Sequence, residues 1–86
     1  MKTKIEVNYL NHNIKVLYKW NEIALIINNV ICATYNAAIA FPFILRGVIE
    51  HEHGQSEILL EMKLRPIGGM LFLTANGHLL AKKWIL

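Results

Sequence analysis

Apolar and polar residues alternate along most of this chain with a period of two, and this period predicts β-strands rather than helices. Residues 4–9 and 14–20 show the alternation clearly, and Asn11-His12-Asn13 between them predicts a turn. The alternation returns over residues 57–65, with Leu59 as one apolar residue on the polar face. Such segments are typical of strands with one face in a core and the other in solvent.

The middle of the chain, residues 23–45, contains no charged residue, and two interpretations compete for it. An apolar helix of about 20 residues is long enough to cross a bilayer. Three asparagines and Pro42 argue against that helix, because hydrocarbon offers their polar groups no partner. Asn28-Asn29 instead predicts a tight turn between two strands, since asparagine tolerates the positive φ values that such a turn requires. We therefore expect sheet here and no membrane span.

Turn signals divide the rest of the chain into further short strands. Residues 43–53 form one predicted strand, with Gly47 inside it as a bulge or a point of close approach. Asn76-Gly77 between two apolar runs is a strong hairpin signal. Residues 36–42 stay open between a helical turn and an irregular strand. About eight short strands predict a single all-β domain over residues 1–86, an antiparallel sandwich or barrel.

A sequence echo suggests that this domain consists of two similar meander units. Sliding the chain by 48 residues without gaps aligns residues 14–33 with residues 62–81, and it places Asn28 on Asn76. Each copy then reads as strand, loop, strand, asparagine turn and strand. Two meanders with the same turn chemistry also look alike by chance, so both explanations stay open.

The order of the segments along residues 13–84 also carries a family resemblance. These segments are NIKVLYKW, ALIINN, ILRG, EILLEMKL and GGMLFLTANGHLLAKKW. Their layout resembles that of Fas apoptotic inhibitory molecule domains, although the first hairpin turn here carries Asn-Asn instead of a glycine. The resemblance implies a compact β-sandwich that acts as a protein-interaction module, and it implies no catalytic residue.

Composition indicates that part of the apolar content lies on the surface. Hydrophobic residues make up 55% of the 86 residues, whereas a domain of this size hides only about 60–65% of its unfolded surface. Large apolar surface patches usually mark a partner or a self-interface. We therefore expect a non-enzymatic domain without a cofactor that acts through protein–protein contact and forms a homo-oligomer.

The charge balance leaves a second class of partner open. Nine lysines and arginines against six glutamates give a net charge of +3. Small β-barrels bind single-stranded nucleic acid through basic grooves and stacking aromatic rings. The candidate contacts are Lys15, Lys19, Trp20, Lys82, Lys83 and Trp84. Lysines that keep edge strands soluble explain the same pattern, so nucleic-acid binding is the alternative function.

Candidate metal chemistry is confined to two neighbouring histidines. On a strand, His51 and His53 share one face and offer two ligands for a metal such as zinc. A third and fourth ligand would have to come from His12, His78 or Cys32, so a metal-binding domain is a further alternative. The solvent-exposed end of a strand explains the same pair without a metal.

The remaining polar residues limit the enzyme classes that the sequence supports. The chain has no aspartate and no pair of carboxylates in the arrangement that hydrolases use. Its single cysteine, Cys32, lies in the uncharged stretch, where we expect a small buried thiol. One cysteine rules out an internal disulfide framework and favours a reducing compartment, so we expect the cytoplasm.

Overall fold

The computed structural model describes residues 2–19, 21–36, 42–66 and 68–84 of the chain. These residues form two four-stranded antiparallel sheets, and none of them lies in a helix. The first sheet consists, in sequence order, of β1 (Lys2–Tyr9), β2 (His12–Lys19), β3 (Glu22–Ile27) and β4 (Val30–Asn36). The second sheet consists, again in sequence order, of β5 (Phe43–His51), β6 (Gly54–Leu64), β7 (Gly69–Ala75) and β8 (His78–Trp84).

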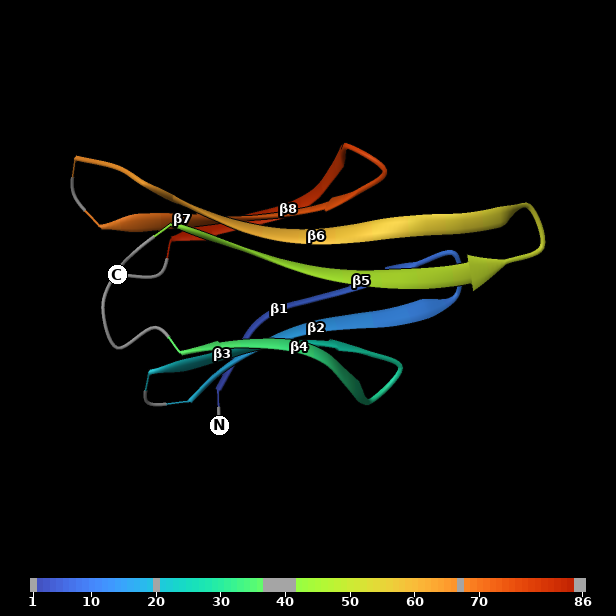
Figure 1. Ribbon diagram of the computed structural model, residues 1–86, viewed down its shortest axis with the longest axis horizontal. Helices are drawn as coiled ribbons and strands as arrows, with labels where there is room; N and C mark the ends of the chain where they lie inside the picture. Colours follow the sequence, from blue (N-terminus) through green and yellow to red (C-terminus); the bar gives the residue numbers. More distant parts are fainter. Residues whose placement is uncertain (1, 20, 37–41, 67, 85–86) are drawn as a thin grey trace.

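The two sheets pack face to face around one apolar core (Figure 1). Strand alternation supplies this core, because every second residue of a strand points to the same side of its sheet. The fully buried side chains from both sheets include Ile14, Val16, Ile23, Leu25, Ile58, Leu60, Leu71 and Leu73. The expected all-β sandwich with eight strands is confirmed, and the sheets do not close into a barrel.

The uncharged middle of the chain forms sheet, as its paired asparagines predict. Asn28 and Asn29 have φ values of 51° and 66° and connect β3 to β4 as a two-residue turn. No helix in the described part of the chain has the length and apolarity needed to cross a bilayer. Asn36 ends β4, whereas residues 37–41 of the unassigned segment lie outside the described residues.

The first turn lies closer to the N-terminus than the sequence predicts. Leu10 and Asn11 form it with φ values of 50° and 63°, and Tyr9 pairs with His12 across it. Asn13 belongs to β2 instead, where its side-chain amide donates a hydrogen bond to Glu6 Oε2 at 2.9 Å. β2 therefore begins with His12 and Asn13, two polar residues that the sequence assigns to the turn.

In each sheet, one asparagine side chain joins a turn to a neighbouring strand. The Asn28 backbone N–H donates to the Asn13 carbonyl at 2.8 Å, and the Asn13 N–H donates to Asn28 Oδ1 at 3.0 Å. The second sheet repeats this exchange between Asn76 and Glu57, at 2.9 Å and 2.8 Å. In the first sheet, this pair of bonds aligns β2 with the turn between β3 and β4. In the second sheet, it aligns β6 with the turn between β7 and β8.

The two sheets are similar units. The gapless alignment by 48 residues matches the last two strands of each sheet but not the strand before them. The turns and the strands around them match at 48 residues, since Leu25 pairs with Ala33 and Leu73 pairs with Ala81. The β2 and β6 strands match at 44 residues instead, because Ile14 is the β2 partner of Ile27 and Ile58 is the β6 partner of Ala75. A longer connection between β6 and β7 accounts for the change of offset.

Gly47 is a point of close approach between the sheets and not a bulge. It pairs with Ile58 in an unbroken register, and a Cβ placed on it would lie 2.9 Å from Ile27 Cδ1. The pairing registers give Gly47 the position that Val7 has in the first sheet. They likewise give Ile27 the position that Ala75 has in the second sheet. The first unit therefore carries the larger residue at both positions, and the second unit carries the smaller one.

We expect Gly47→Val to lower the free energy of unfolding by about 1–3 kcal/mol, because the new methyl groups meet Ile27 in a filled core. Ile27→Ala alone should cost about 2–4 kcal/mol by leaving a cavity. The double variant relieves the new contact by shortening residue 27, so it should lose at least about 1 kcal/mol less than the sum of the single losses. Urea denaturation of the four proteins measures this coupling, and strictly additive losses would contradict the close approach.

Asn76 gives a second stability test, because its φ is 48° and its side chain bonds both Glu57 and Ser56. Asn76→Gly keeps the positive φ accessible and removes only the side-chain bonds, so it should cost about 1 kcal/mol. Asn76→Ala loses both and should cost about 2 kcal/mol. Thermal or urea unfolding ranks the variants. Equal stability of the glycine and alanine proteins would show that the backbone conformation contributes nothing.

Candidate functional site

The two edge strands β4 and β5 lie on the same face of the sandwich. Figure 1 shows both of them at the front, one at the edge of each sheet, and they pack beside each other. Among the described residues, no backbone hydrogen bond joins β4 to β5. This face therefore presents two open strand edges at once.

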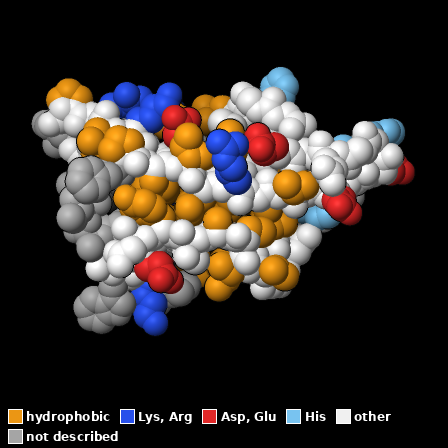
Figure 2. Space-filling model, viewed as in Figure 1, with side chains coloured by type: hydrophobic (Ala, Val, Ile, Leu, Met, Phe, Trp, Pro, Cys, Tyr) orange, Lys and Arg blue, Asp and Glu red, His pale blue; other side chains and the backbone are white. Residues whose placement is uncertain are grey.

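Four large apolar side chains on these strands are exposed, and we call them the β4–β5 edge surface: Val30, Ile31, Ile44 and Val48. Their exposed fractions are 64%, 60%, 48% and 53% in that order. Figure 2 views this side of the molecule and shows apolar side chains gathered between the two sheets. Exposed apolar side chains beside open strand edges are positions where a second protein can pair with the edge and remove apolar area from water.

The alternation of β5 explains half of this surface. Its buried and exposed residues alternate along the whole strand, so Ile44, Arg46, Val48 and Glu50 all face away from the core. Arg46 makes an ion pair with Glu57 of β6 at 3.4 Å, and both side chains are more than half exposed. Two apolar and two charged residues thus share the outer face of one edge strand.

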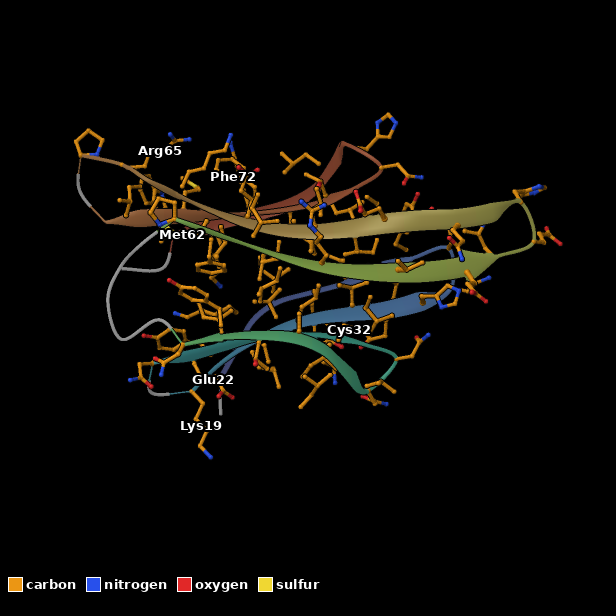
Figure 3. All side chains as sticks on the ribbon, viewed as in Figure 1. Lys19, Glu22, Cys32, Met62, Arg65 and Phe72 are labelled. Carbon is orange, nitrogen blue, oxygen red and sulfur yellow. The ribbon has the colours of Figure 1, made fainter. Side chains whose placement is uncertain are left out.

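A bulge in β4 accounts for the exposure of Cys32. The pairing of β3 with β4 shifts between Leu25 and Ile26, which leaves Cys32 as the additional residue on the edge strand. The expectation of a buried thiol is therefore wrong: Cys32 is exposed, and its Sγ lies 3.6 Å from the Val30 carbonyl oxygen. Figure 3 shows this residue on β4, and its Cβ faces the position of Gly47 at 3.5 Å.

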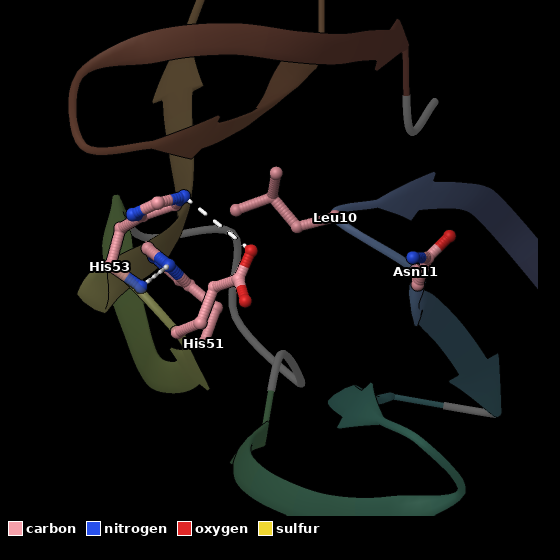
Figure 4. A pocket seen from close by; sticks show the side chains of 5 residues that line it. Leu10, Asn11, His51 and His53 are labelled. Atoms are coloured by element: carbon pink, nitrogen blue, oxygen red, sulfur yellow. Dashed lines mark hydrogen bonds and ion pairs between the residues drawn. The ribbon is translucent and has the colours of Figure 1, made fainter.

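The two histidines proposed as metal ligands lie at one end of the sandwich, in an open pocket of about 400 Å³ between two hairpin turns (Figure 4). Its lining consists of Leu10, Asn11, His51, Glu52 and His53. His51 ends β5, whereas His53 belongs to the following turn. The rings therefore do not share a strand face, and their centroids are 6.4 Å apart at an angle of 61°.

Hydrogen bonds occupy both ring nitrogens of His51. Its Nδ1 accepts from the His53 backbone N–H at 3.3 Å, so the neutral ring carries its proton on Nε2. That Nε2–H then donates to Ser56 Oγ at 2.9 Å. Ser56 is buried and also accepts from the Asn76 side-chain amide at 3.2 Å. His51 is thus part of the network that holds the asparagine turn, which explains it without a metal.

No group of three or more histidine, cysteine or acidic side chains in the described residues is arranged to hold a metal ion. His53 lies 3.6 Å from Glu52, and both side chains are more than four-fifths exposed. His12 hydrogen-bonds the Asn28 side chain at 2.8 Å, and His78 is exposed after the second asparagine turn. The predicted additional ligands therefore do not gather around His51 and His53.

The residues proposed for nucleic-acid contact are distributed over both sheets. Lys15 and Lys19 lie on β2 of the first sheet. Lys82, Lys83 and Trp84 lie on β8 of the second sheet, and Trp20 lies outside the described residues. The described members of this set therefore do not form one basic face.

A basic cluster surrounds Phe72 on the second sheet, and Lys82 of the predicted set lies opposite this residue on β8. Lys63 Nζ and the Arg65 guanidinium lie 5.4 Å and 5.5 Å from the centroid of its ring. Figure 3 shows Arg65 beside Phe72. Because two cations already contact this ring, it is less available for stacking with a nucleotide base.

In the comparisons with protein-family models, curated proteins and solved structures, no match to the chain was found. The resemblance to Fas apoptotic inhibitory molecule domains therefore stays a prediction.

Sequence reasoning predicted an apolar surplus but not its location. Val30 and Ile31 belong to an apolar run that looks like core, and their exposure depends on the edge position of β4 in the sheet order. One signal in the sequence pointed to an exposed face on β5. The uncharged stretch ends at Arg46, and this charged residue has the same strand parity as Ile44 and Val48.

We expect an equimolar addition of Zn²⁺ to leave the melting temperature unchanged, because His51 already uses both ring nitrogens. Differential scanning fluorimetry with and without zinc measures the shift, and a His51→Ala, His53→Ala double variant serves as the control. A zinc-dependent rise of several degrees that disappears in the double variant would show that the two rings rearrange to bind metal.

Proposed function

We propose that this protein is a non-enzymatic interaction domain that associates with a second copy of itself through the β4–β5 edge surface. The observation that carries the proposal is the exposure of four large aliphatic side chains on two neighbouring open edge strands. Association removes these apolar side chains from water and can also satisfy the open strand edges. A second copy covers it with the same residues, since the interface of a two-fold dimer is self-complementary.

Covering these exposed apolar side chains would contribute favourably to the free energy of dimer formation. Burying a half-exposed valine or isoleucine side chain gains on the order of 1 kcal/mol. Eight such side chains, four from each copy, contribute several kcal/mol against the loss of translational and rotational freedom on association. Open backbone edges add hydrogen-bonding groups that a second strand can satisfy. The proposal therefore combines apolar contact with possible strand pairing.

The exposed free thiol of Cys32 is consistent with a reducing compartment, so we propose the cytoplasm as the location. Nucleic-acid binding and metal binding remain the alternative functions. Neither gains support from the described residues, since the basic side chains are dispersed and His51 is bonded within the domain.

The two similar units supply a matched pair of variants for testing self-association. Ile31 and Leu79 occupy equivalent positions beside the β4 and β8 bulges, and their exposed fractions are 60% and 54%. Ile31→Ser should weaken the dimer by about 5- to 30-fold, because it removes apolar area from the β4–β5 edge surface. Leu79→Ser removes a similar area on β8 and should leave the dimer unchanged.

Sedimentation velocity over about 1 to 100 µM protein measures both dissociation constants, and thermal melts verify that the variants are folded. A wild-type protein that stays monomeric over this range would contradict the proposal. An equal effect of the two serine variants would contradict the location of the interface.

A further inference from the structure

β5 differs from the other three edge strands in the regularity of its pairing. The pairing of β1 with β2 shifts between Thr3 and Ile5, and β4 and β8 each carry a bulge. β5 pairs with β6 from Phe43 to His51 without a shift. Bulges and lysines on an edge strand hinder the addition of another strand. β5 has neither, so it is the edge that is best prepared to accept one.

The direction of the β5 backbone groups follows from two hydrogen bonds of β6. In an antiparallel pair, the N–H and the C=O of one residue point to the same side of its strand. Both groups of Glu57 bond Asn76, on the side away from β5. Val48 lies opposite Glu57, so the backbone groups of Val48 point to the open edge. The same holds for every second residue along the strand, which are Ile44, Arg46, Val48 and Glu50.

We propose that β5 of one copy pairs antiparallel with β5 of a second copy, centred on Val48. This inference rests on the proposed self-association and specifies how it occurs. Val48 meets Val48 of the second copy at the two-fold axis, and Arg46 meets Glu50 of the second copy on each side of it. All of these residues have their backbone groups at the open edge, so they form hydrogen-bonded pairs. Their side chains lie on one outer face, where opposite charges stabilise the pairing.

Charge and backbone direction exclude the neighbouring registers. Centring the pair on Arg46 places Arg46 directly against Arg46 of the second copy, and like charges in that position are destabilising. Centring it on Gly47 leaves Arg46 against Val48 and Ile44 against Glu50, without any ion pair. A shift by a single residue sets open backbone groups against groups that already bond β6. Centring it on Ile49 sets Val48 against Glu50, again without an ion pair within the strand. The register on Val48 is the one of these that satisfies both conditions.

This arrangement sets Val48 of the two copies side by side and brings the β4–β5 edges of both copies together. A two-fold axis perpendicular to the sheets joins the two second sheets into one continuous sheet, and it brings the β4 strands of both copies edge to edge beneath them. Val30 and Ile31 lie on those strands. The present contacts of the two charged residues are surface ones, since Arg46 bonds the exposed Glu57 and Glu50 bonds Gln55 at 3.3 Å. Both residues are thus available to exchange partners.

Charge-reversal variants test the register directly. Arg46→Glu and Glu50→Arg should each weaken the homodimer by at least about tenfold, because each creates like-charged pairs at two symmetric positions. The double variant Arg46→Glu/Glu50→Arg should return to within about threefold of the wild type. An equimolar mixture of the two single variants should form a heterodimer, since every 46–50 pair in it is again opposite in charge. Lys82→Glu is the control, because it reverses a charge on β8 at the far edge of the same sheet, and it should leave the dissociation constant unchanged.

Sedimentation velocity of each protein and of the mixture gives the dissociation constants, and circular dichroism melts verify folding. The result separates this inference from the general proposal. A monomeric wild type overturns both. A wild-type dimer whose affinity is insensitive to the charge reversals, or single variants that fail to associate when mixed, overturns the strand register and leaves self-association intact.

A cross-linking experiment tests the same register by distance. In a Cys32→Ser background, Val48→Cys places two thiols across the axis with Cα atoms about 5.5 Å apart, within the range for a disulfide. Ile44→Cys in the same background is the matched control, because its two copies lie about 27 Å apart along the strands. Mild oxidation should yield a disulfide-linked dimer only for Val48→Cys. Efficient cross-linking of Ile44→Cys, or none at either position, overturns the proposed pairing.

Discussion

The fold depends on two asparagine side chains that each join a turn to the strand beside it. Asn28 and Asn76 both adopt a positive φ and exchange two hydrogen bonds with a residue of the second strand of their sheet. This exchange fixes the register of three consecutive strands. Because a shift of one residue would turn every side chain to the opposite face, the register in turn decides which residues form the core.

The same bonds determine which backbone groups remain open at the edge of the second sheet. Glu57 directs its N–H and C=O towards the Asn76 turn, and its neighbour Val48 is left with its own groups pointing outward. The turn between β7 and β8 therefore sets which backbone groups are open at the β5 edge. His51 and Ser56 belong to the same network, so these polar residues near the turn are explained by stability rather than by catalysis.

Much of the fold could be predicted from the sequence, because local rules dominate it. Period-two alternation and asparagine turns gave the strands, the hairpins and the two similar units. The first turn was misplaced, since Leu10 takes a positive φ that leucine rarely adopts and Asn13 is used inside a strand. The exposure of Cys32 was missed because a bulge depends on pairing partners that are distant in sequence. For the same reason the apolar surplus was predicted, but its location on β4 and β5 was not.

The two units differ in side-chain volume at two equivalent positions, and this difference has a consequence for assembly. Two first units packed on each other would set Val7 against Ile27, which is more volume than the space allows. Two second units would set Gly47 against Ala75 and leave a void. At this contact, one unit of each kind fills the space, because Gly47 of the second unit meets Ile27 of the first. The halves of this chain are thus complementary rather than interchangeable, which disfavours swapped assemblies built from like halves of different molecules.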